Sequence, residues 1–387
     1  MKQKKWMALA LSAVLALGCL TGCQNAAGSG QEARQAPEEE TQQPAEDIAE
    51  QDDSKAEEEA PEDAGQEEEA ATEAQDAEAA DAADEGDDTL IRVVALKGPT
   101  AMGMVSMMDQ AESEELKDHQ YDFQIVAAVD EVPAMLAKGE VDLAAVPANL
   151  ASVLFNNTEG EVQVVAINTL GVLYLVENGE TLTDIADLKG KTIYASGQGA
   201  TPEYALSYIL KQNGIDPEKD VTIEWKSEHT ECLTAITEND GAVALLPQPF
   251  VTTAQMKAEG IRVAFDLTKE WEKLQAEAEN PSALLTGALV VRKEFATQHP
   301  EALEDFLAHY KESVAFTNNN LEEAAALIEK YDIVPAAVAL KAIPACNIVY
   351  IDKDEMQQKL AGYLEVLYEQ NPKSVGGQLP AEDFYIK

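Results

Sequence analysis

Short apolar runs alternate with helical patterns along residues 89–387, and this alternation constrains the fold more than any other feature. Leu90–Leu96 and 141–146 are almost continuously apolar, which is typical of strands buried on both faces. Helical patterns separate such runs, so the sequence predicts βαβ units, a parallel sheet and the α/β class. About 300 residues exceed what one core usually supports, and two lobes are expected. Further strands are predicted at 123–129, 162–176, 192–195, 221–225, 242–246 and 284–291.

Charge divides the chain into three segments. Residues 1–22 carry +3, residues 24–88 carry −23 and residues 89–387 carry −25, for a total of −45. A chain with this negative net charge is not expected to bind nucleic acid. Four cysteines in 387 residues are too few for a disulfide scaffold. With 45% hydrophobic residues, the chain as a whole is not disordered.

The amino-terminal segment has the layout of a secretory signal. Three lysines precede a charge-free, mostly apolar run at 6–20, which is shorter than the roughly 20 residues that a membrane-spanning helix needs. The run ends in Leu20-Thr21-Gly22-Cys23, which resembles the bacterial lipobox. The resemblance implies cleavage before Cys23, lipidation of its thiol and anchoring on the outer face of the cell membrane. The alternative is an ordinary secreted protein with an incidental cysteine.

Residues 24–88 lack aromatic side chains and consist almost wholly of Ala, Glu, Asp, Gln, Pro and Gly. Such a composition cannot bury enough apolar surface to offset the entropy of ordering. We therefore expect an acidic disordered tether. Transient helices are the competing interpretation, because Ala and Glu favour helix.

A glycine-rich turn follows the predicted strand at 192–195. It runs from Ser196 to Thr201 and leads into a helix at 202–213, for which Thr201 is the expected N-cap. Such a turn presents free N–H groups and the positive end of a helix dipole to a ligand. Residues 97–103 repeat the arrangement after the first strand. Because ligands sit outside the carboxyl ends of parallel strands, both turns should line one crevice.

Motifs for cofactors, metals and catalysis are incomplete. The glycine-rich turn begins a dinucleotide motif but has Pro202 at its last position, and Ile185 stands where a phosphate-binding loop needs its first glycine. Neither cysteine nor histidine spacing indicates a metal site, and no nucleophile motif occurs. The sequence therefore predicts no cofactor, no metal and no enzyme. Cys232 and Cys346 could pair or stay as buried thiols.

Three segments together resemble type II periplasmic substrate-binding proteins of ABC importers. The first is a helix at 131–142 that ends in Gly139-Glu140-Val141-Asp142; the second is 187–193; the third is the run 287–295 followed by Pro300-Glu301. Within that class, the chain is most similar to the nitrate, taurine, sulfonate and thiamine-precursor branch. The resemblance implies a two-lobed Venus-flytrap fold with two crossing strands, a cleft that closes on a solute, and delivery by a monomer to an ABC permease.

The resemblance, with the terminal signals, gives the expected domain limits. These are a signal peptide at 1–22, the lipidated cysteine and tether at 23–88, a first lobe at 89–175 plus 288–387, and a second lobe at 176–287.

The resemblance also implies that the ligand meets loops of both lobes. The implied contacts are Lys97, Gly98, Thr100, Met102, Asn149, Thr169, Gly197, Gln198, Gly199, Thr201 and Gln248. Each has a structural alternative: the glycines could serve only tight turns, Thr201 and Asn149 could be helix caps, and Met102 is expected to fill the core more often than to touch a ligand. His229 is a weaker candidate, and a place in a surface loop is expected for it.

The nature of the solute follows from the charges in these loops. They contain no arginine, which leaves Lys97 and the helix N-termini as positive groups. The sequence therefore favours a small neutral, aromatic or singly anionic solute over a sulfate-like dianion. Tyr174 and Tyr194 would suit a planar heterocycle if they reach the cleft. Two other functions stay open: a pyrimidine-precursor synthase, whose cysteine-rich iron-site pattern is absent here, and a surface sensor.

Overall fold

A computed structural model describes residues 89–278 and 281–387. The predicted signal peptide, the lipidation site at Cys23 and the acidic tether lie outside these described residues. In the described chain, none of the helices combines the length and the apolarity that crossing a membrane requires.

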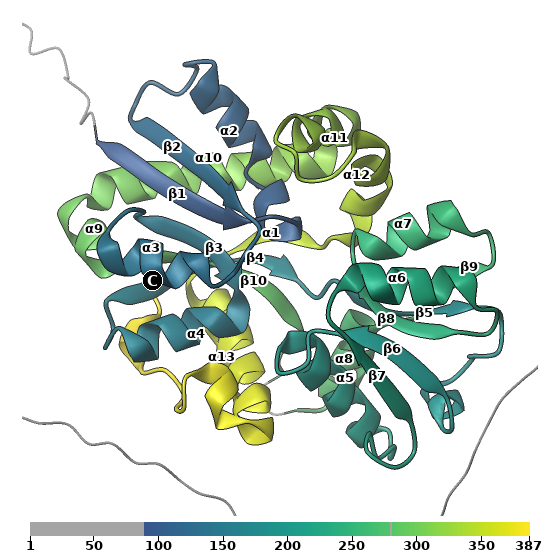
Figure 1. Cartoon of the computed structure of the whole chain (residues 1–387). Helices are drawn as coiled ribbons and strands as arrows, with labels where there is room; N and C mark the ends of the chain where they lie inside the picture. Colours follow the sequence, from purple (N-terminus) through teal and green to yellow (C-terminus); the bar gives the residue numbers. More distant parts are fainter. Residues whose placement is uncertain (1–88, 279–280) are drawn as a thin grey trace, which may run out of the picture. The chain divides into compact units, whose positions relative to one another are not determined.

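The strands form two sheets, each the centre of one lobe (Figure 1). The six-stranded lobe is built on the sheet with the order β11-β4-β10-β3-β1-β2, and the five-stranded lobe on the sheet with the order β7-β6-β8-β5-β9. The strands of the first sheet are β1 (Leu90–Leu96), β2 (Gln120–Val126), β3 (Leu143–Pro147), β4 (Val162–Leu170), β10 (Leu285–Arg292) and β11 (Ile348–Ile351). Those of the second are β5 (Leu173–Asn178), β6 (Thr192–Ser196), β7 (Thr222–Lys226), β8 (Val243–Pro247) and β9 (Ile261–Asp266).

The α/β class and the two-lobed architecture are confirmed, but the sheets are mixed rather than purely parallel. β1 pairs in parallel with β2 and β3, and β6 pairs in parallel with β7 and β8. β10 runs antiparallel to β3 and β4, and β5 runs antiparallel to β8 and β9. The antiparallel strands β5 and β10 are those that the chain enters as it passes from one lobe to the other.

The single strand predicted at 162–176 is two strands in different sheets. β4 ends at Leu170 and β5 begins at Leu173, with Gly171 between them. A side chain at Gly171 would collide with the hydroxyl of Thr268, in the five-stranded lobe, and with Leu284, in the other passage between the lobes. The two connecting segments therefore lie in contact, and only glycine fits there.

Helices cover both faces of each sheet. In chain order they are α1 (Pro99–Met102), α2 (Val105–Glu112), α3 (Glu131–Lys138), α4 (Ala148–Asn157), α5 (Thr201–Gln212), α6 (His229–Glu238), α7 (Phe250–Lys257), α8 (Leu267–Gln275), α9 (Lys293–Gln298), α10 (Pro300–Asn319), α11 (Leu321–Lys330), α12 (Ala336–Ala342) and α13 (Lys353–Gln370). Short 3₁₀ helices occur at Ile185–Leu188, Ile343–Ala345, Pro372–Val375 and Glu382–Phe384.

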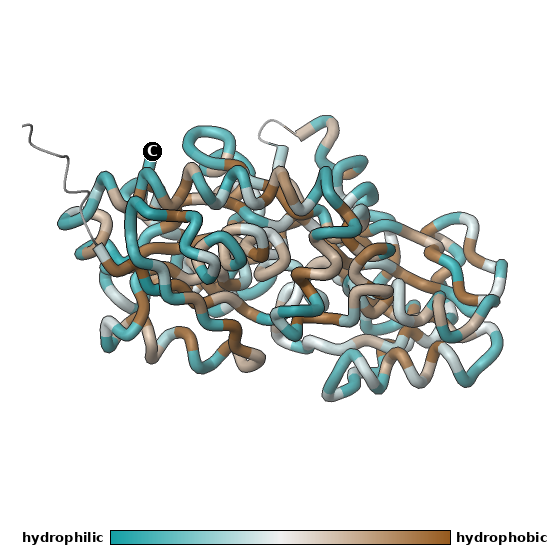
Figure 2. The backbone as a smooth tube through the Cα atoms, turned by 90° about the horizontal axis from the view of Figure 1, so that it is seen from above, coloured by the Kyte–Doolittle hydropathy of each residue, from teal (hydrophilic) through white to brown (hydrophobic). Residues whose placement is uncertain are grey.

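Three buried apolar clusters make up the core. One continues from the α4 and α13 face of the first sheet to the α5 and α8 face of the second. Another fills the opposite face of the first sheet, under α2 and α10, and the third lies between the second sheet and helices α6 and α7. Figure 2 shows apolar segments running through the interior and mainly hydrophilic segments in the outer loops. Cys232 and Cys346 are free thiols, both buried in these clusters.

Candidate functional site

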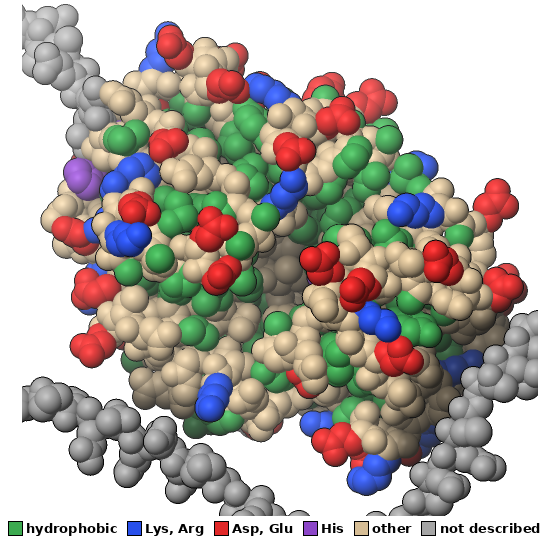
Figure 3. Space-filling model, in the orientation of Figure 1, with side chains coloured by type: hydrophobic (Ala, Val, Ile, Leu, Met, Phe, Trp, Pro, Cys, Tyr) green, Lys and Arg blue, Asp and Glu red, His purple; other side chains and the backbone are tan. Residues whose placement is uncertain are grey.

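The two lobes leave a hollow between them (Figure 3). Its walls are mainly uncharged polar side chains and backbone, while the acidic and basic side chains lie around its rim. The loops after the parallel strands of both lobes carry most of the residues that the sequence singles out.

The loop after β1 is held by its own backbone and by one ion pair. Gly98 has a φ of 131°, which favours glycine, and its carbonyl accepts the N–H groups of Ala101 and Met102. The Thr100 hydroxyl donates to the Leu96 carbonyl at 2.8 Å. Lys97 is exposed, and its Nζ lies 3.0 Å from the Asp332 carboxylate. The ammonium group of Lys97 thus has an acidic partner already.

Thr100, Asn168 and Thr169 come together where β4 leaves the first lobe. The Thr169 hydroxyl donates to Asn168 Oδ1 at 3.1 Å, and Asn168 Nδ2 approaches the Thr100 carbonyl at 3.5 Å. All three residues are buried, and Gly287 of β10 packs so closely that a side chain there would collide with Asn168 and Thr100. This cluster brings polar groups from two segments, α1 and β4, to one place.

Met102 and Asn149 have structural partners. Met102 has no exposed surface and packs in the core with Met104 and Met107. Asn149 lies in the first turn of α4, whose N-cap is Pro147, so a role as N-cap is wrong for Asn149. Its amide nitrogen donates to the Ser374 carbonyl at 3.0 Å.

In the second lobe, Thr201 is not the N-cap of α5. Ala200 takes that position, and Thr201 is the first helical residue. The Thr201 hydroxyl oxygen lies 3.0 Å from that of Tyr363, a fully buried residue of α13. The prediction failed because of a tertiary contact: the Thr201 hydroxyl, which was expected to cap α5, is instead paired with α13.

A carboxylate of the same chain lies beside the positive end of α5. The backbone N–H of Gly199 donates to Glu203 Oε2 at 2.5 Å, and the Tyr204 hydroxyl donates to the Gly199 carbonyl at 3.1 Å. Gly197 and Gly199 have φ values of 81° and 78°, so both need the freedom of glycine. Gln198 between them is exposed. An N–H group that the sequence predicts to be free for a ligand therefore already binds an anion.

Ser196 and His229 form a pair that sequence reasoning did not find. Ser196 Oγ lies 2.5 Å from His229 Nδ1, and the imidazole packs against the Phe250 ring with centroids 5.2 Å apart. Burial lowers the pKa of His229, which favours the neutral imidazole. The expectation of a surface-loop histidine is wrong, because His229 begins α6 and is half-buried. The positions of the two residues could have predicted this pair, because Ser196 ends β6 and His229 follows the adjacent parallel strand β7.

Gln248 lies after β8 and is buried. Its Oε1 accepts hydrogen bonds from the Thr252 hydroxyl at 2.9 Å and from the Thr252 N–H at 3.3 Å. Its backbone N–H donates to the Val172 carbonyl, beside the crossing strand. Among the described residues, nothing pairs with its amide nitrogen, which leaves a donor at this strand end.

Tyr174, Tyr194 and Lys226 also have contacts within the protein. Tyr174 is buried, and its hydroxyl donates to the Ala345 carbonyl at 2.8 Å. Lys226 lies 5.2 Å from the Tyr194 ring centroid and 3.1 Å from Glu224 Oε2. Tyr174 therefore packs between the second sheet and the segment before β11, and the Tyr194 ring has a cation against it.

A family model described as "ABC transporter, phosphonate, periplasmic substrate-binding protein" matches residues 112–341. The chain belongs to this family. The matched region takes in both lobes, from the end of α2 to α12. The prediction of a periplasmic substrate-binding protein of an ABC transporter is thereby confirmed.

Solved structures of ABC-transporter proteins have the same fold as this binding protein. An ABC transporter protein from Parabacteroides distasonis is 24% identical, with a TM-score of 0.65 over 78% of this chain and 99% of that one. The aliphatic sulphonate binding protein SsuA of Escherichia coli is 17% identical, with a TM-score of 0.60 over 77% and 92%. The alkanesulfonate-binding SsuA of Xanthomonas axonopodis pv. citri, bound to MOPS, is 13% identical, with a TM-score of 0.55 over 76% and 95%. No curated protein matches the chain.

Proposed function

We propose that this binding protein captures a small polar solute, uncharged or singly charged, in the hollow between its lobes and delivers it to an ABC permease. The family supplies the general role, and the residues around the hollow support the choice of solute. The family's name would suggest a phosphonate, which carries up to two negative charges and needs positively charged partners. An uncharged solute needs only matched hydrogen-bond donors and acceptors.

The observation that carries the proposal is the bond from the Gly199 N–H to the Glu203 carboxylate. A helix N-terminus is a ready site for phosphate-like anions, and here a carboxylate already binds in the turn that leads into α5. A dianion that approached this turn would meet the negative charge of Glu203. Lys97 and Lys226 have acidic partners of their own, which reduces the positive potential that they offer.

The proposed contacts are neutral groups from both lobes. Thr100 and Thr169 would serve from the six-stranded lobe, and the turn 197–199 with Gln248 from the five-stranded lobe. The Ser196–His229 pair adds a hydroxyl and a neutral imidazole beside that turn. A solute that bonds to both lobes at once would favour the closed arrangement, because its affinity for that arrangement is higher.

The same proposal includes a lipid anchor at Cys23, the acidic tether at 24–88 and a monomer on the outer face of the cell membrane. It also includes the absence of turnover. The Ser196–His229 pair resembles half of a nucleophilic triad, but in the described residues no carboxylate pairs with the other ring nitrogen of His229.

A thermal-shift screen of the full chain tests the proposal. The probes are heterocycles, neutral amino acids, methylphosphonate, taurine and nitrate, each followed by mass spectrometry of the recovered solute. A solute at 100 times its Kd adds about 2.7 kcal/mol to stability, which a melting curve resolves easily. We expect the largest rise from an uncharged or zwitterionic solute, recovered intact. The largest rise from methylphosphonate, or conversion of any solute, would contradict the proposal.

A further inference from the structure

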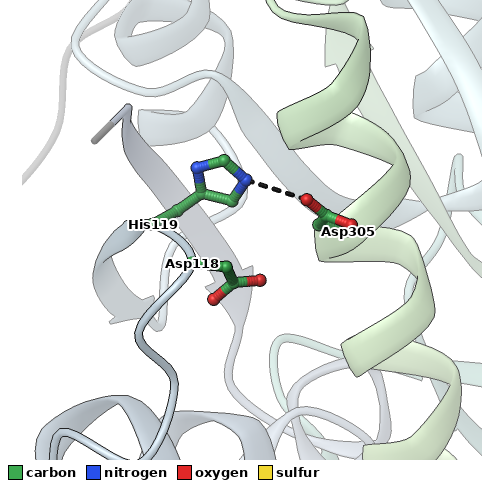
Figure 4. Close-up of side chains that lie close together, drawn as sticks. All are labelled: Asp118, His119 and Asp305. Atoms are coloured by element: carbon green, nitrogen blue, oxygen red, sulfur yellow. Dashed lines mark hydrogen bonds and ion pairs between the residues drawn. The ribbon is translucent and has the colours of Figure 1, made fainter. Parts of the chain in front are cut away.

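A cluster of aspartate and histidine side chains lies away from the hollow, at the amino end of β2 (Figure 4). Asp118 and His119 come directly before β2, and Asp305 projects from α10 toward them. His119 Nε2 lies 3.1 Å from Asp305 Oδ2. One ligand atom from each of the three residues falls within 4.8 Å of the other two.

The two oxygens of Asp118 have different surroundings. Oδ2 accepts a hydrogen bond from the Tyr121 hydroxyl at 3.2 Å and pairs with His309 Nε2 at 2.7 Å. Oδ1 is buried, and no hydrogen-bond donor of the described residues reaches it. A carboxylate oxygen buried without a partner is costly, so a cation at this oxygen would stabilise the fold.

Histidines are the partners of both carboxylates in the cluster. Asp118 and Asp305 are close to each other, yet in the described part of the chain no lysine or arginine forms an ion pair with either carboxylate. The His119 side chain is only 4% exposed, whereas that of Asp305 is 51% exposed. The cluster thus combines a buried imidazole with a carboxylate that solvent reaches, which gives an ion a route of entry.

We propose that Asp118, His119 and Asp305 bind a divalent transition-metal ion such as Zn²⁺ or Mn²⁺. Imidazole nitrogen and carboxylate oxygen are the donors that such ions take in proteins. A tetrahedral ion with bonds of about 2.0–2.1 Å holds its ligand atoms about 3.3 Å apart, close to the 3.1 Å between His119 and Asp305. A water molecule would complete the coordination on the exposed side.

His309 and Tyr121 act as positioning residues for this site. Both bond to Oδ2 of Asp118, which fixes the carboxylate and leaves Oδ1 without a partner among the described residues. Hydrogen bonds of this kind to a ligating carboxylate are typical of protein metal sites. Asp305 and His309 stand one helical turn apart on α10, and this spacing was the signal in the sequence.

The ion and the solute would occupy opposite ends of the first sheet. The loops proposed to contact the solute follow the carboxyl ends of β1 and β3. The aspartate and histidine cluster precedes the amino end of β2, which runs parallel to β1. The ion therefore joins the segment before β2 to α10 and takes no part in solute binding. Loss of one function does not imply loss of the other.

Calorimetric titration of the full chain with Zn²⁺ or Mn²⁺ alone tests the site. The protein is purified without a polyhistidine tag and stripped with a chelator. We expect one saturable high-affinity equivalent and a higher melting temperature. Asp305→Asn should abolish this equivalent, and His309→Gln should weaken it by about 10–100-fold. His299→Gln, which removes a histidine outside the cluster, should leave it unchanged.

The acidic segment 24–88 will bind divalent ions weakly, and the variant comparison separates that background. The proposal would be overturned if Asp305→Asn and the parent bound the metal with the same stoichiometry and affinity. It would also be overturned if the parent bound no metal. Asp305 is half exposed, so Asp305→Asn should fold, and circular dichroism checks this. With Co²⁺ as the probe, visible absorption bands that His119→Gln removes would establish the imidazole ligand.

Discussion

The hydroxyl oxygens of Thr201 and Tyr363 lie 3.0 Å apart and join α5 of the five-stranded lobe to α13, which packs on the six-stranded lobe. Two further bonds reinforce this contact: Gln370 Nε2 donates to the Tyr204 carbonyl, and Asn371 Nδ2 donates to the Tyr204 hydroxyl. Helix α5, which begins at the glycine-rich turn, is thus hydrogen-bonded to the opposite lobe. A movement of this turn would therefore move groups that contact α13.

Thr201→Val should destabilise the protein. It leaves the buried Tyr363 hydroxyl without a partner, and such a group costs about 1–3 kcal/mol. Urea unfolding measures the loss. The double variant Thr201→Val with Tyr363→Phe removes both hydroxyls and should recover part of it. Equal stability of parent and Thr201→Val would show that the pair contributes nothing.

Glu203→Gln should raise the affinity for anionic solutes. The change removes the negative charge beside the Gly199 N–H and frees the helix N-terminus for an anion. Titration with methylphosphonate at two salt concentrations measures the effect, which should shrink with added salt. Glu322→Gln, in the first turn of α11, is the matched control and should change nothing. A loss of methylphosphonate affinity in Glu203→Gln would refute this role.

The pH dependence of stability should show the burial of His229. Because burial lowers its pKa below 6.5, the unfolded chain takes up a proton at this residue before the folded chain does. The contribution of the neutral imidazole is complete above about pH 6.5 and is lost as the pH falls through the lower, folded pKa. The stability difference between parent and His229→Gln should therefore grow as the pH rises from about 5 to 8. A flat difference in urea unfolding over that range would contradict this account.

Arg262→Leu should be strongly destabilising. Arg262 lies 2.7 Å from Glu177, whose side chain is fully buried. Burial would raise the pKa of Glu177, but hydrogen bonds from Thr181 and Leu182, with that from Arg262, lower it below its usual value. Removing the arginine leaves a buried charge and should cost about 3 kcal/mol by urea unfolding. Adding Glu177→Gln should restore part of the loss; a further loss instead would show that the ion pair does not dominate.

Local pattern was enough to predict the buried strands. β1, β6 and β8 lie within one residue of the predicted limits, because strands covered on both faces are continuously apolar. β9 and β11 were missed, since both lie at edges of their sheets and consist largely of half-buried residues. The break at Gly171 was also missed, because only the contact with the other connecting segment requires it.

The site residues depended more on distant contacts. A threonine before a proline can be an N-cap or the first helical residue, and the bond to Tyr363, 162 residues away, decides the matter for Thr201. Likewise, Ser196 and His229 meet only because β6 and β7 are neighbours. Sequence spacing predicted the loops that carry the candidate site, whereas the partners of each side chain are a property of the folded chain.

Calorimetric titration of the full chain with the best uncharged solute from the screen, beside methylphosphonate and methanesulfonate in the same buffer, tests the central claim most directly. The account predicts saturable one-to-one binding of the uncharged solute, which is recovered unchanged, and weaker binding of methylphosphonate, the probe that can carry two negative charges. Tighter binding of methylphosphonate than of the uncharged solute would contradict it.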